Sequence, residues 1–341
     1  MTTVEHVTTV EQSLEADYDV LRSSAALINL SDVGLVRVEG SGAHDLVQHL
    51  LSRDIEFLTP ERSITGLLLT EDGTAVDMVS CIVDDDGLVL RTGFGTGRRV
   101  ADHLEAHATP ETVVELLDLE ILGVEGPYAW SAIGEVLDPD IASLPFESVL
   151  PLGWGDHEIT FSRIGVTGEY GYQLCGTTAA IGELREALTG PAVPIGRAAV
   201  EVAMLEVRQP LLSRELADGA DVLTAGLQWL LDLSKPEFLG REAVVEGHRA
   251  GQSHRTIGIE VDAPADGLEG CDLVVDDHRV GTVVWAVRSP QREGALALAR
   301  IRAELAASGL ELAVATNDGS STARTLSSPY VVPASWGVPI L

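Results

Sequence analysis

The sequence predicts an α+β protein with two parts, a mixed helix-and-strand body and a smaller β-rich unit after it. The chain has 341 residues, of which 45% are hydrophobic, and this length favours about two domains with a sizeable core. Helical and strand-like periods alternate as far as Gln252, whereas short strands separated by turns dominate the remainder. We therefore divide the chain into residues 1–252 and residues 253–341, and expect the second part to be a barrel or sandwich.

The first half of the body contains a strand, a helix, a hairpin and a second helix. Residues 35–40 alternate as a strand does, and residues 43–51 place leucines at helical spacing. Residues 77–93 indicate a hairpin that turns at residues 84–87. The segment RRVADHLEAHA that follows has the pattern of a helix.

A second set of strands and a helix completes the body. Residues 159–166 and 171–176 have the composition of strands, and residues 179–188 have helical spacing. Beyond residue 252 the expected strands are TIGIEVD, CDLVVDDHRVGTVVWAV, ALALARI and ELAVATND. These segments predict the β-rich unit.

The charge balance excludes two classes of partner. The chain carries 22 Lys plus Arg against 53 Asp plus Glu, a formal net charge of −31. Binding to nucleic acid or to an anionic membrane surface relies on clustered Lys and Arg, which this sequence lacks. We expect neither partner.

No targeting segment or cysteine framework is evident. There is no run of about 18 apolar residues, and the acidic N-terminal stretch is unlike a signal peptide, so we expect a cytoplasmic protein. Cys81, Cys175 and Cys271 lie far apart without a C-x-x-C pair. They indicate small core residues rather than disulfides or a zinc site.

Two local patterns invite a functional interpretation but are weak. His103 and His107 are four residues apart, as helical metal ligands are, but no third ligand is marked and a solvated helix face explains them better. Residues 91–99 (RTGFGTGRR) form a glycine-rich loop before a helix, yet they match neither phosphate-binding fingerprint. No G-x-S-x-G motif supports hydrolase chemistry. We predict no metal site.

A carboxylate on a glycine-broken turn stands out at residues 165–174 (GVTGEYGYQL). Gly168 and Gly171 allow a tight turn and a close approach on either side of Glu169. A solvated turn would be served equally well by Asp or Asn. Glu169 is therefore a candidate ligand-binding residue, with a water-facing hairpin as the alternative.

Several blocks in order resemble the glycine-cleavage T-protein, or aminomethyltransferase, superfamily, and the likeness covers nearly the whole chain. They are LLSRDIEFL, TEDGTAVDMVS, RIGVTGEYGYQL, MLEVRQPLLSREL, AGLQWLLDL, KPEFLGREAV and VRSPQREGALALARI. The resemblance implies two ferredoxin-like αβ lobes around a central ligand hole, closed by a C-terminal β-barrel, with tetrahydrofolate in the hole.

The resemblance also implies roles for particular residues. Glu169 matches the glutamate that the family places against the pterin ring, where a carboxylate can accept two charge-assisted hydrogen bonds, and Tyr172 belongs to the same motif. Asp77 falls at the aspartate that positions the one-carbon group, where it can stabilise a cationic centre or orient the attacking nitrogen. A water-facing position at the start of a strand is the alternative for Asp77.

Three further residues match family positions near the cofactor. Trp336 in the ending PYVVPASW is expected over the cofactor site, with a barrel plug as the alternative. Trp229 and Arg241 are also candidate cofactor-binding residues, but packing for Trp229 and a structural ion pair for Arg241 explain them better.

Departures from the family pattern concern the same pocket. The family's asparagine, tyrosine and two helix arginines fall on residues without comparable polar groups, namely Gly93, Val166, Val200 and Met204. Glu201 and Glu206 remain, but the arginines that would pair with them in the family pattern are absent, so we expect both carboxylates to lack cationic partners. Such losses change which ligand the pocket can neutralise and orient.

These observations predict a tetrahydrofolate-dependent one-carbon transferase that acts on a small methylated donor, as a demethylase or a methyl- or aminomethyltransferase. Because the chain is acidic and lacks the helix arginines, we do not expect a lipoyl carrier protein as partner. Two alternatives stay open. One is a folate-free or non-enzymatic binding protein on the same fold, and the other is an authentic glycine-cleavage aminomethyltransferase.

Overall fold

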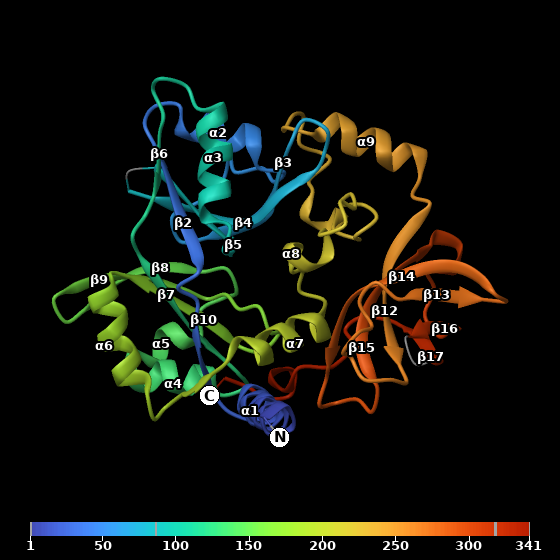
Figure 1. The fold of residues 1–341 in the computed structure, drawn as a ribbon. Coiled ribbons are helices and arrows are strands. Elements are labelled where there is room, and N and C mark those ends of the chain that lie inside the picture. The colour runs from blue at the N-terminus through green and yellow to red at the C-terminus, as the bar shows by residue number, and fades with distance from the viewer. Residues whose placement is uncertain (1, 86, 317–318, 341) are drawn as a thin grey trace.

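The computed structural model describes residues 2–85, 87–316 and 319–340, with side chains from residue 13 onward. Figure 1 shows two αβ lobes and a β-barrel, with the short helix α8 (Leu212–Glu215) between them. This arrangement confirms the predicted fold class. Among the described residues, no helix is long and apolar enough to span a lipid bilayer.

The first lobe is built on a five-stranded sheet of order β3-β4-β5-β2-β6. Its strands are β2 (Val33–Glu39), β3 (Ser63–Leu69), β4 (Ala75–Asp84), β5 (Gly87–Phe94) and β6 (Val113–Leu116). Helices α2 (Ala43–Leu50) and α3 (Gly97–His107) cover one face. Leu88 and Leu90 of β5 pack in the core beneath these helices. Since side chains alternate along a strand, Val89 and Arg91 belong to the opposite face.

The second lobe has a six-stranded sheet of order β11-β1-β7-β10-β9-β8. Its strands are β1 (Ala26–Asn29), β7 (Glu120–Glu125), β8 (Val149–Trp154), β9 (His157–Ser162), β10 (Gly171–Gly176) and β11 (Val193–Ile195). Helices α4 (Ala129–Val136), α5 (Pro139–Ala142) and α6 (Thr178–Leu188) bury its core. Because β1 precedes the whole first lobe in sequence, the two lobes are interleaved.

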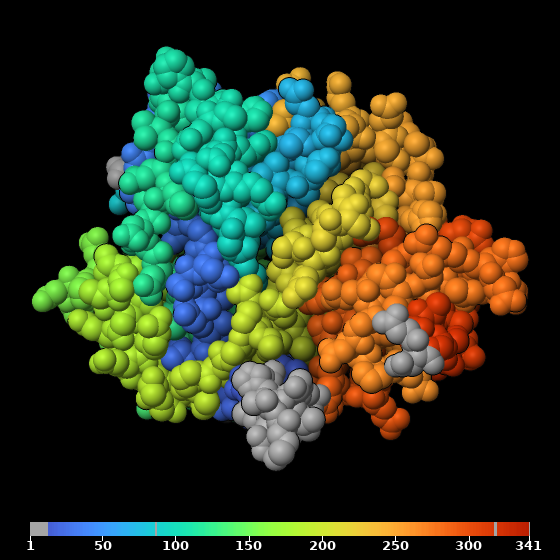
Figure 2. All heavy atoms as spheres, viewed as in Figure 1, coloured from blue at the N-terminus to red at the C-terminus, as the bar shows by residue number. Residues whose placement is uncertain are grey.

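The third body is a closed barrel of order β12-β15-β14-β13-β16-β17. Its strands are β12 (His254–Val261), β13 (Asp272–Val275), β14 (His278–Arg288), β15 (Ala295–Arg302), β16 (Glu311–Thr316) and β17 (Gly319–Leu326). A connecting segment with α8, the 3-10 turn η1 (Gln228–Leu230) and α9 (Arg241–Ala250) leads into it. In Figure 2 this segment, yellow to light orange, lies between the first lobe and the barrel.

Helix α7 (Arg197–Val207) joins the three bodies at an apolar centre. Val200 and Met204 of this helix pack against Leu35 of the first lobe, Ile28 of the second lobe and Trp285 of the barrel. This centre also forms one wall of the main cavity described below, so burial of apolar surface fixes the distance between the lobes.

An arginine near the end of helix α1 (Thr2–Ser23) bridges two buried carboxylates. Arg22 donates from Nη1 to Glu169 at 2.8 Å and from Nη2 to Glu206 at 2.7 Å. Glu206 also accepts hydrogen bonds from the hydroxyl groups of Tyr18 and Ser289, the latter beside the barrel strand β14. The three ionic side chains thus tie α1, α7, the turn at Glu169 and the barrel together.

This network corrects one expectation from the sequence. Glu206 has not lost a cationic partner, because Arg22 supplies it from a distant part of the chain. Glu201 is likewise paired, with Arg197 at 3.2 Å and Arg214 at 3.8 Å. The prediction that both carboxylates lack partners is wrong.

The weak local patterns have ordinary surroundings. His103 and His107 stack on α3 with ring centroids 4.8 Å apart, and burial lowers the pKa of His103 to about 4. Within the described residues there is no group of three His, Cys, Asp or Glu placed to hold a metal ion. Cys81 is buried in the first lobe, and Cys175 and Cys271 are half-buried.

Replacing Arg22 by methionine should lower the free energy of unfolding by about 3–5 kcal/mol, because it leaves two buried carboxylates without their cation. Urea unfolding followed by circular dichroism measures the change. The control is Arg98→Met, since Arg98 is half-exposed in its pairs with Asp102 and Glu105 and its loss should cost less than about 1 kcal/mol. Equal losses in the two variants would contradict the central role of Arg22.

Candidate functional site

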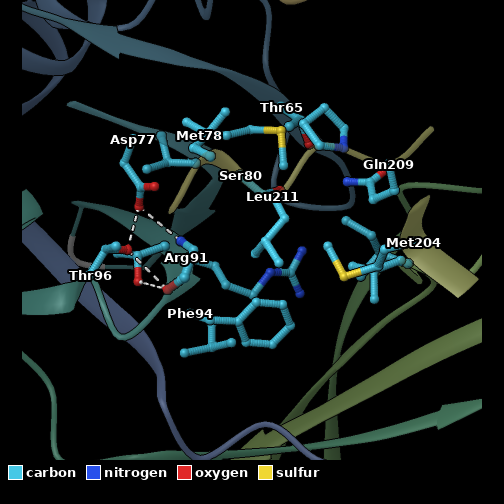
Figure 3. Close-up of a pocket in the computed structure, with 18 of the residues that line it drawn as sticks. Thr65, Asp77, Met78, Ser80, Arg91, Phe94, Thr96, Met204, Gln209 and Leu211 are labelled. Atoms are coloured by element: carbon cyan, nitrogen blue, oxygen red, sulfur yellow. Dashed lines mark hydrogen bonds between the residues drawn. The ribbon is translucent and has the colours of Figure 1, made fainter. Parts of the chain in front are cut away.

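A cavity of about 220 Å³ lies between the two lobes. The first lobe contributes β4 and β5, the second lobe contributes β10, and α7 with the residues after it forms the remaining wall. Figure 3 shows Asp77 and Thr96 at one side, with Arg91, Phe94, Met204 and Leu211 nearer the middle. Hereafter this is the central cavity.

Asp77 presents a desolvated carboxylate to the central cavity. Its Oδ2 accepts hydrogen bonds from the hydroxyl of Thr96 at 2.6 Å and from the backbone N–H of Gly93 at 2.8 Å. The Arg99 guanidinium is more distant, at 3.8 Å. Burial raises the pKa of Asp77, and the bonds from Thr96 and Gly93 partly oppose that rise. The carboxylate is therefore oriented mainly by neutral donors, with Arg99 as a longer ion-pair partner.

The glycine at position 93 allows this placement. A Cβ atom on Gly93 would lie 2.9 Å from Oδ1 of Asp77, which is closer than real Cβ contacts allow. Any side chain here, including the asparagine of the family pattern, requires the Asp77 carboxylate to shift. The departure at Gly93 thus bears directly on the carboxylate expected to act.

Arg91 is a buried cation on the cavity wall. Its side chain extends from β5, and its Nη1 donates to Oε1 of Gln173 on β10 at 2.7 Å. Its Nη2 has no hydrogen-bond partner among the described residues. Burial lowers the pKa of Arg91 to about 10, so the group is still charged at neutral pH. The other wall positions that depart from the family pattern, Val166 and Met204, are apolar.

A second cavity adjoins the first and is lined by the C-terminal tail, which we define as residues 328–340. Its walls include Glu169 and Trp336. It shares Phe146, Gly165 and Gln209 with the central cavity. The two spaces therefore lie on either side of common residues and could hold different parts of one elongated ligand.

Glu169 has different partners from those expected. Its carboxylate is fully buried and accepts hydrogen bonds from Arg22 and from the backbone N–H groups of Ala334 at 3.0 Å and Ser335 at 2.8 Å. The turn is possible because Gly168 adopts a positive φ of 80°. In this conformation the carboxylate anchors the tail. Its contact with a pterin ring stays a prediction that requires the tail to release it.

The remaining candidates are dispersed. Tyr172 is buried in the core of the second lobe, where its hydroxyl donates to the carbonyl of Ala142 at 2.7 Å, and it lines neither cavity. Arg241 also lies outside both cavities and donates to the carbonyls of Leu233 and Lys235. Trp229 is 51% exposed on the wall of the central cavity. Trp336, within the tail, is 69% exposed on the wall of the second cavity.

Comparison with known families identifies both parts of the chain. The GCVT N-terminal domain matches residues 4–235, and the glycine cleavage T-protein C-terminal barrel domain matches residues 254–331. The chain belongs to the glycine-cleavage T-protein family. This membership confirms the resemblance inferred from the sequence blocks.

Individual T-protein relatives align over nearly their full length. The aminomethyltransferase of Synechococcus elongatus is 30% identical over 332 residues, covering 94% of this chain and 88% of the relative. That of Listeria welshimeri is 26% identical over 327 residues, covering 93% and 89%. The crystal structure of glycine cleavage system aminomethyltransferase T from Bartonella henselae shares the fold, with a TM-score of 0.86, 22% identity and coverage of 94% and 90%.

T-protein membership decides two of the sequence-based expectations. The family carries out folate-dependent one-carbon transfer, which confirms tetrahydrofolate as the predicted cofactor. The expectation that a lipoyl carrier protein is not a partner is at odds with the family, in which that carrier is the usual partner. The relatives support aminomethyl transfer better than demethylation.

Sequence reasoning missed three other polar groups that line the central cavity. Thr96 and Arg91 lie within the glycine-rich stretch considered for phosphate binding, and Gln173 is on the strand after the Glu169 turn. The sequence carried one sign of the role of Arg91, because a cation stands there within a largely apolar strand. Such a residue belongs to the sheet face opposite the helices.

Replacing Thr96 by valine should raise the pKa of Asp77 further, because a hydrogen bond that stabilises the charged carboxylate is lost. Carboxyl ¹³C chemical shifts recorded against pH measure this pKa. Thr65→Val, in the same cavity and without a hydrogen bond to Asp77, is the control. An unchanged or lower pKa in the Thr96 variant would show that the hydroxyl does not support the carboxylate.

Proposed function

We propose that this protein is an aminomethyltransferase that passes a one-carbon unit to tetrahydrofolate in the central cavity, with Asp77 at the reacting centre. The observation that carries the proposal is the Asp77 carboxylate, which is buried and oriented by Thr96 and Gly93, with the half-exposed Arg99 as a longer ion-pair partner at 3.8 Å. The relatives named aminomethyltransferase support the same reaction. On this reading the donor is an aminomethyl group carried on the lipoyl arm of a carrier protein.

The cavity fits a flat heterocycle with polar edges. Phe94, Met204 and Leu211 offer apolar surface. Two buried atoms without a partner among the described residues, Nη2 of Arg91 and Oγ of Ser80, offer hydrogen bonds. This mixture of apolar walls with few polar groups is typical of small-molecule sites. When bound, tetrahydrofolate supplies the nitrogen that accepts the one-carbon unit.

Asp77 can assist the transfer in two ways. A carboxylate in a desolvated site stabilises positive charge that develops on the atom carrying the one-carbon unit. It can also accept a proton from the attacking nitrogen, and its raised pKa makes it a better base than an exposed aspartate. Thr96 and Gly93 keep the Asp77 carboxylate oriented in both of these roles.

The adjoining tail cavity suits the rest of an elongated cofactor. Trp336 and Arg163 lie on its wall, and Gln209 lies on the wall of both cavities. Under this proposal the tail repositions on binding, so that Ala334 and Ser335 release Glu169 to the cofactor and Trp336 packs on it. Trp229 shields the central cavity from its exposed side.

A second candidate donor is a small methylated compound, which would make the protein a folate-dependent demethylase. The observation in its favour is electrostatic. A net charge of −31 disfavours encounter with an acidic carrier protein, and a fixed cation at Arg91 disfavours a cationic aminomethyl group nearby.

The purified protein should be assayed with tetrahydrofolate against an aminomethyl-lipoyl carrier protein. Parallel reactions supply a panel of methylamino, methylthio and methoxy compounds. Ammonia release with the carrier is the expected result. Turnover restricted to the small compounds would replace the first donor with the second, and binding of tetrahydrofolate without turnover of any donor would contradict the enzyme assignment.

Asp77→Asn should lower kcat about 10²- to 10⁴-fold while leaving the Kd for tetrahydrofolate within about threefold, because its work lies in the transition state. Single-turnover kinetics and equilibrium titration separate the two quantities. Glu147→Gln is the matched change of another carboxylate on the cavity wall and should reduce kcat far less. Equal effects of the two substitutions would show that Asp77 has no special role.

A further inference from the structure

Three polar side chains form a row across the first-lobe sheet. In the antiparallel register, Thr65 of β3 lies opposite Ser80 of β4, and Ser80 lies opposite Arg91 of β5. Residues directly opposite on neighbouring strands have their side chains on the same face, about 4.5–5.5 Å apart at Cβ. All three residues line the central cavity. The row therefore presents two hydroxyl groups and a guanidinium to one enclosed space.

The row has unused hydrogen-bonding capacity. Arg91 is 7% exposed and Ser80 is 5% exposed. Within the described part of the chain, Nη2 of Arg91 and Oγ of Ser80 have no hydrogen-bond partner. Gln173 uses its oxygen to receive Nη1 of Arg91, so its amide nitrogen adds another donor near the same place. Each of these groups can donate a hydrogen bond.

The charge of Arg91 is also unbalanced. Among the described residues, no carboxylate lies within ion-pair distance of its guanidinium. Figure 3 shows the side chain pointing into the cavity among Phe94, Leu211 and Met204, and the same apolar residues belong to one buried cluster. A buried cation without a counter-ion is costly, and burial of a charge is normally compensated by an opposite charge with good geometry.

We propose that Arg91, Ser80 and Thr65, with Gln173, bind the carboxylate of a small one-carbon donor in the central cavity. The planar guanidinium, with one nitrogen still free and flanked by a hydroxyl, suits a carboxylate. A single cation suits a monoanion better than a phosphate dianion. The small donor is proposed as a second substrate beside the lipoyl-bound aminomethyl group, and the inference rests on the proposed function only in placing the transfer in this cavity.

The position of Asp77 adds the second half of the recognition. Asp77 and Arg91 both line this cavity, and Figure 3 shows the Asp77 carboxylate at one side, beside Thr96, with the Arg91 guanidinium nearer the middle. One side of the cavity therefore carries a carboxylate and another carries a cation. A small donor with a carboxylate at one end and a methylamino, methylthio or methoxy group at the other matches this separation of charge.

Calorimetric titration of the whole chain tests the carboxylate directly. The probes are N-methylglycine, methylthioacetate and methoxyacetate, each compared with its neutral carboxamide. At least one acid should bind about tenfold or more tightly than its amide, because only the acid offsets the buried guanidinium. Equal binding of every acid and its amide, or no binding of any acid, would overturn the proposal.

Variants show whether Arg91 is the group responsible. Arg91→Met should abolish the preference for the acid and raise the thermal midpoint of the ligand-free protein, since an unpaired buried charge is removed. Arg91→Lys keeps the charge, loses the fork geometry and should retain part of the preference. If the methionine variant does not fold, Arg91→Lys alone tests the site, and a preference equal to that of the original chain then counts against it. Arg98→Met, a half-exposed arginine on α3, is the control, and an acid preference that survives in both Arg91 variants would refute the site.

Folate itself has carboxylates on its glutamyl tail, and a separate experiment shows whether Arg91 binds one of those instead of a donor carboxylate. Tetrahydrofolate and 6-methyltetrahydropterin, which lacks the tail, are titrated into the original chain and into Arg91→Met. The proposal expects the substitution to change the affinity of both by a similar factor. A loss confined to tetrahydrofolate would assign the carboxylate to folate and overturn the donor assignment. These experiments measure binding and not turnover. The carboxylate site can therefore be confirmed even if the protein does not transfer an aminomethyl group, and it can be refuted even if the protein does.

Discussion

The double ion pair of Arg22 with Glu169 and Glu206 is the constraint on which the arrangement of the bodies depends. The three charged side chains are almost entirely excluded from solvent, so each charge is tolerated only while the others stay in place. The partners come from α1, from the turn before β10 and from α7, and Glu169 in turn accepts two backbone N–H groups of the tail. If any one of these segments moved, a buried charge would be left without its partner in apolar surroundings.

This constraint determines what the cavities can do. Glu169 anchors the tail, and the tail lines the second cavity, so that cavity keeps its shape only while the ion pairs persist. The central cavity is fixed by different forces, namely the β4–β5 hairpin and apolar packing of α7 against both lobes. A cavity fixed by packing therefore adjoins a space whose wall depends on polar contacts. Because the hydrogen bonds of Asp77 to Thr96 and Gly93 do not involve the tail, a rearrangement of the tail would leave them in place.

Sequence patterns predicted the longer elements, in which periodicity is visible, and missed features that depend on contacts between residues far apart in the chain. The hairpin of β4 and β5, the helices α3 and α6 and the strand-dense barrel were all evident from periodicity. Strands β1 and β11 were not, because segments of four and three residues carry no period. Arg22 pairs with residues 147 and 184 positions away, and no local rule reveals such a partner. Family likeness directed attention to Asp77 and Glu169, but only the folded chain shows that one faces a cavity and the other holds the tail.

The cation of the central cavity shows why lost residues are an incomplete guide to a ligand. Residues 200 and 204 of α7 are apolar where the family pattern has arginine, and this loss changes which ligand the pocket can neutralise. Yet Arg91 reaches the central cavity from β5 and lines it together with Met204. A guanidinium fixed to a strand beside Ser80 is oriented by the sheet, whereas one on α7 would be oriented by a helix. Ligand charge can thus be matched by a cation on another element, and the direction of its free nitrogen decides which group is bound.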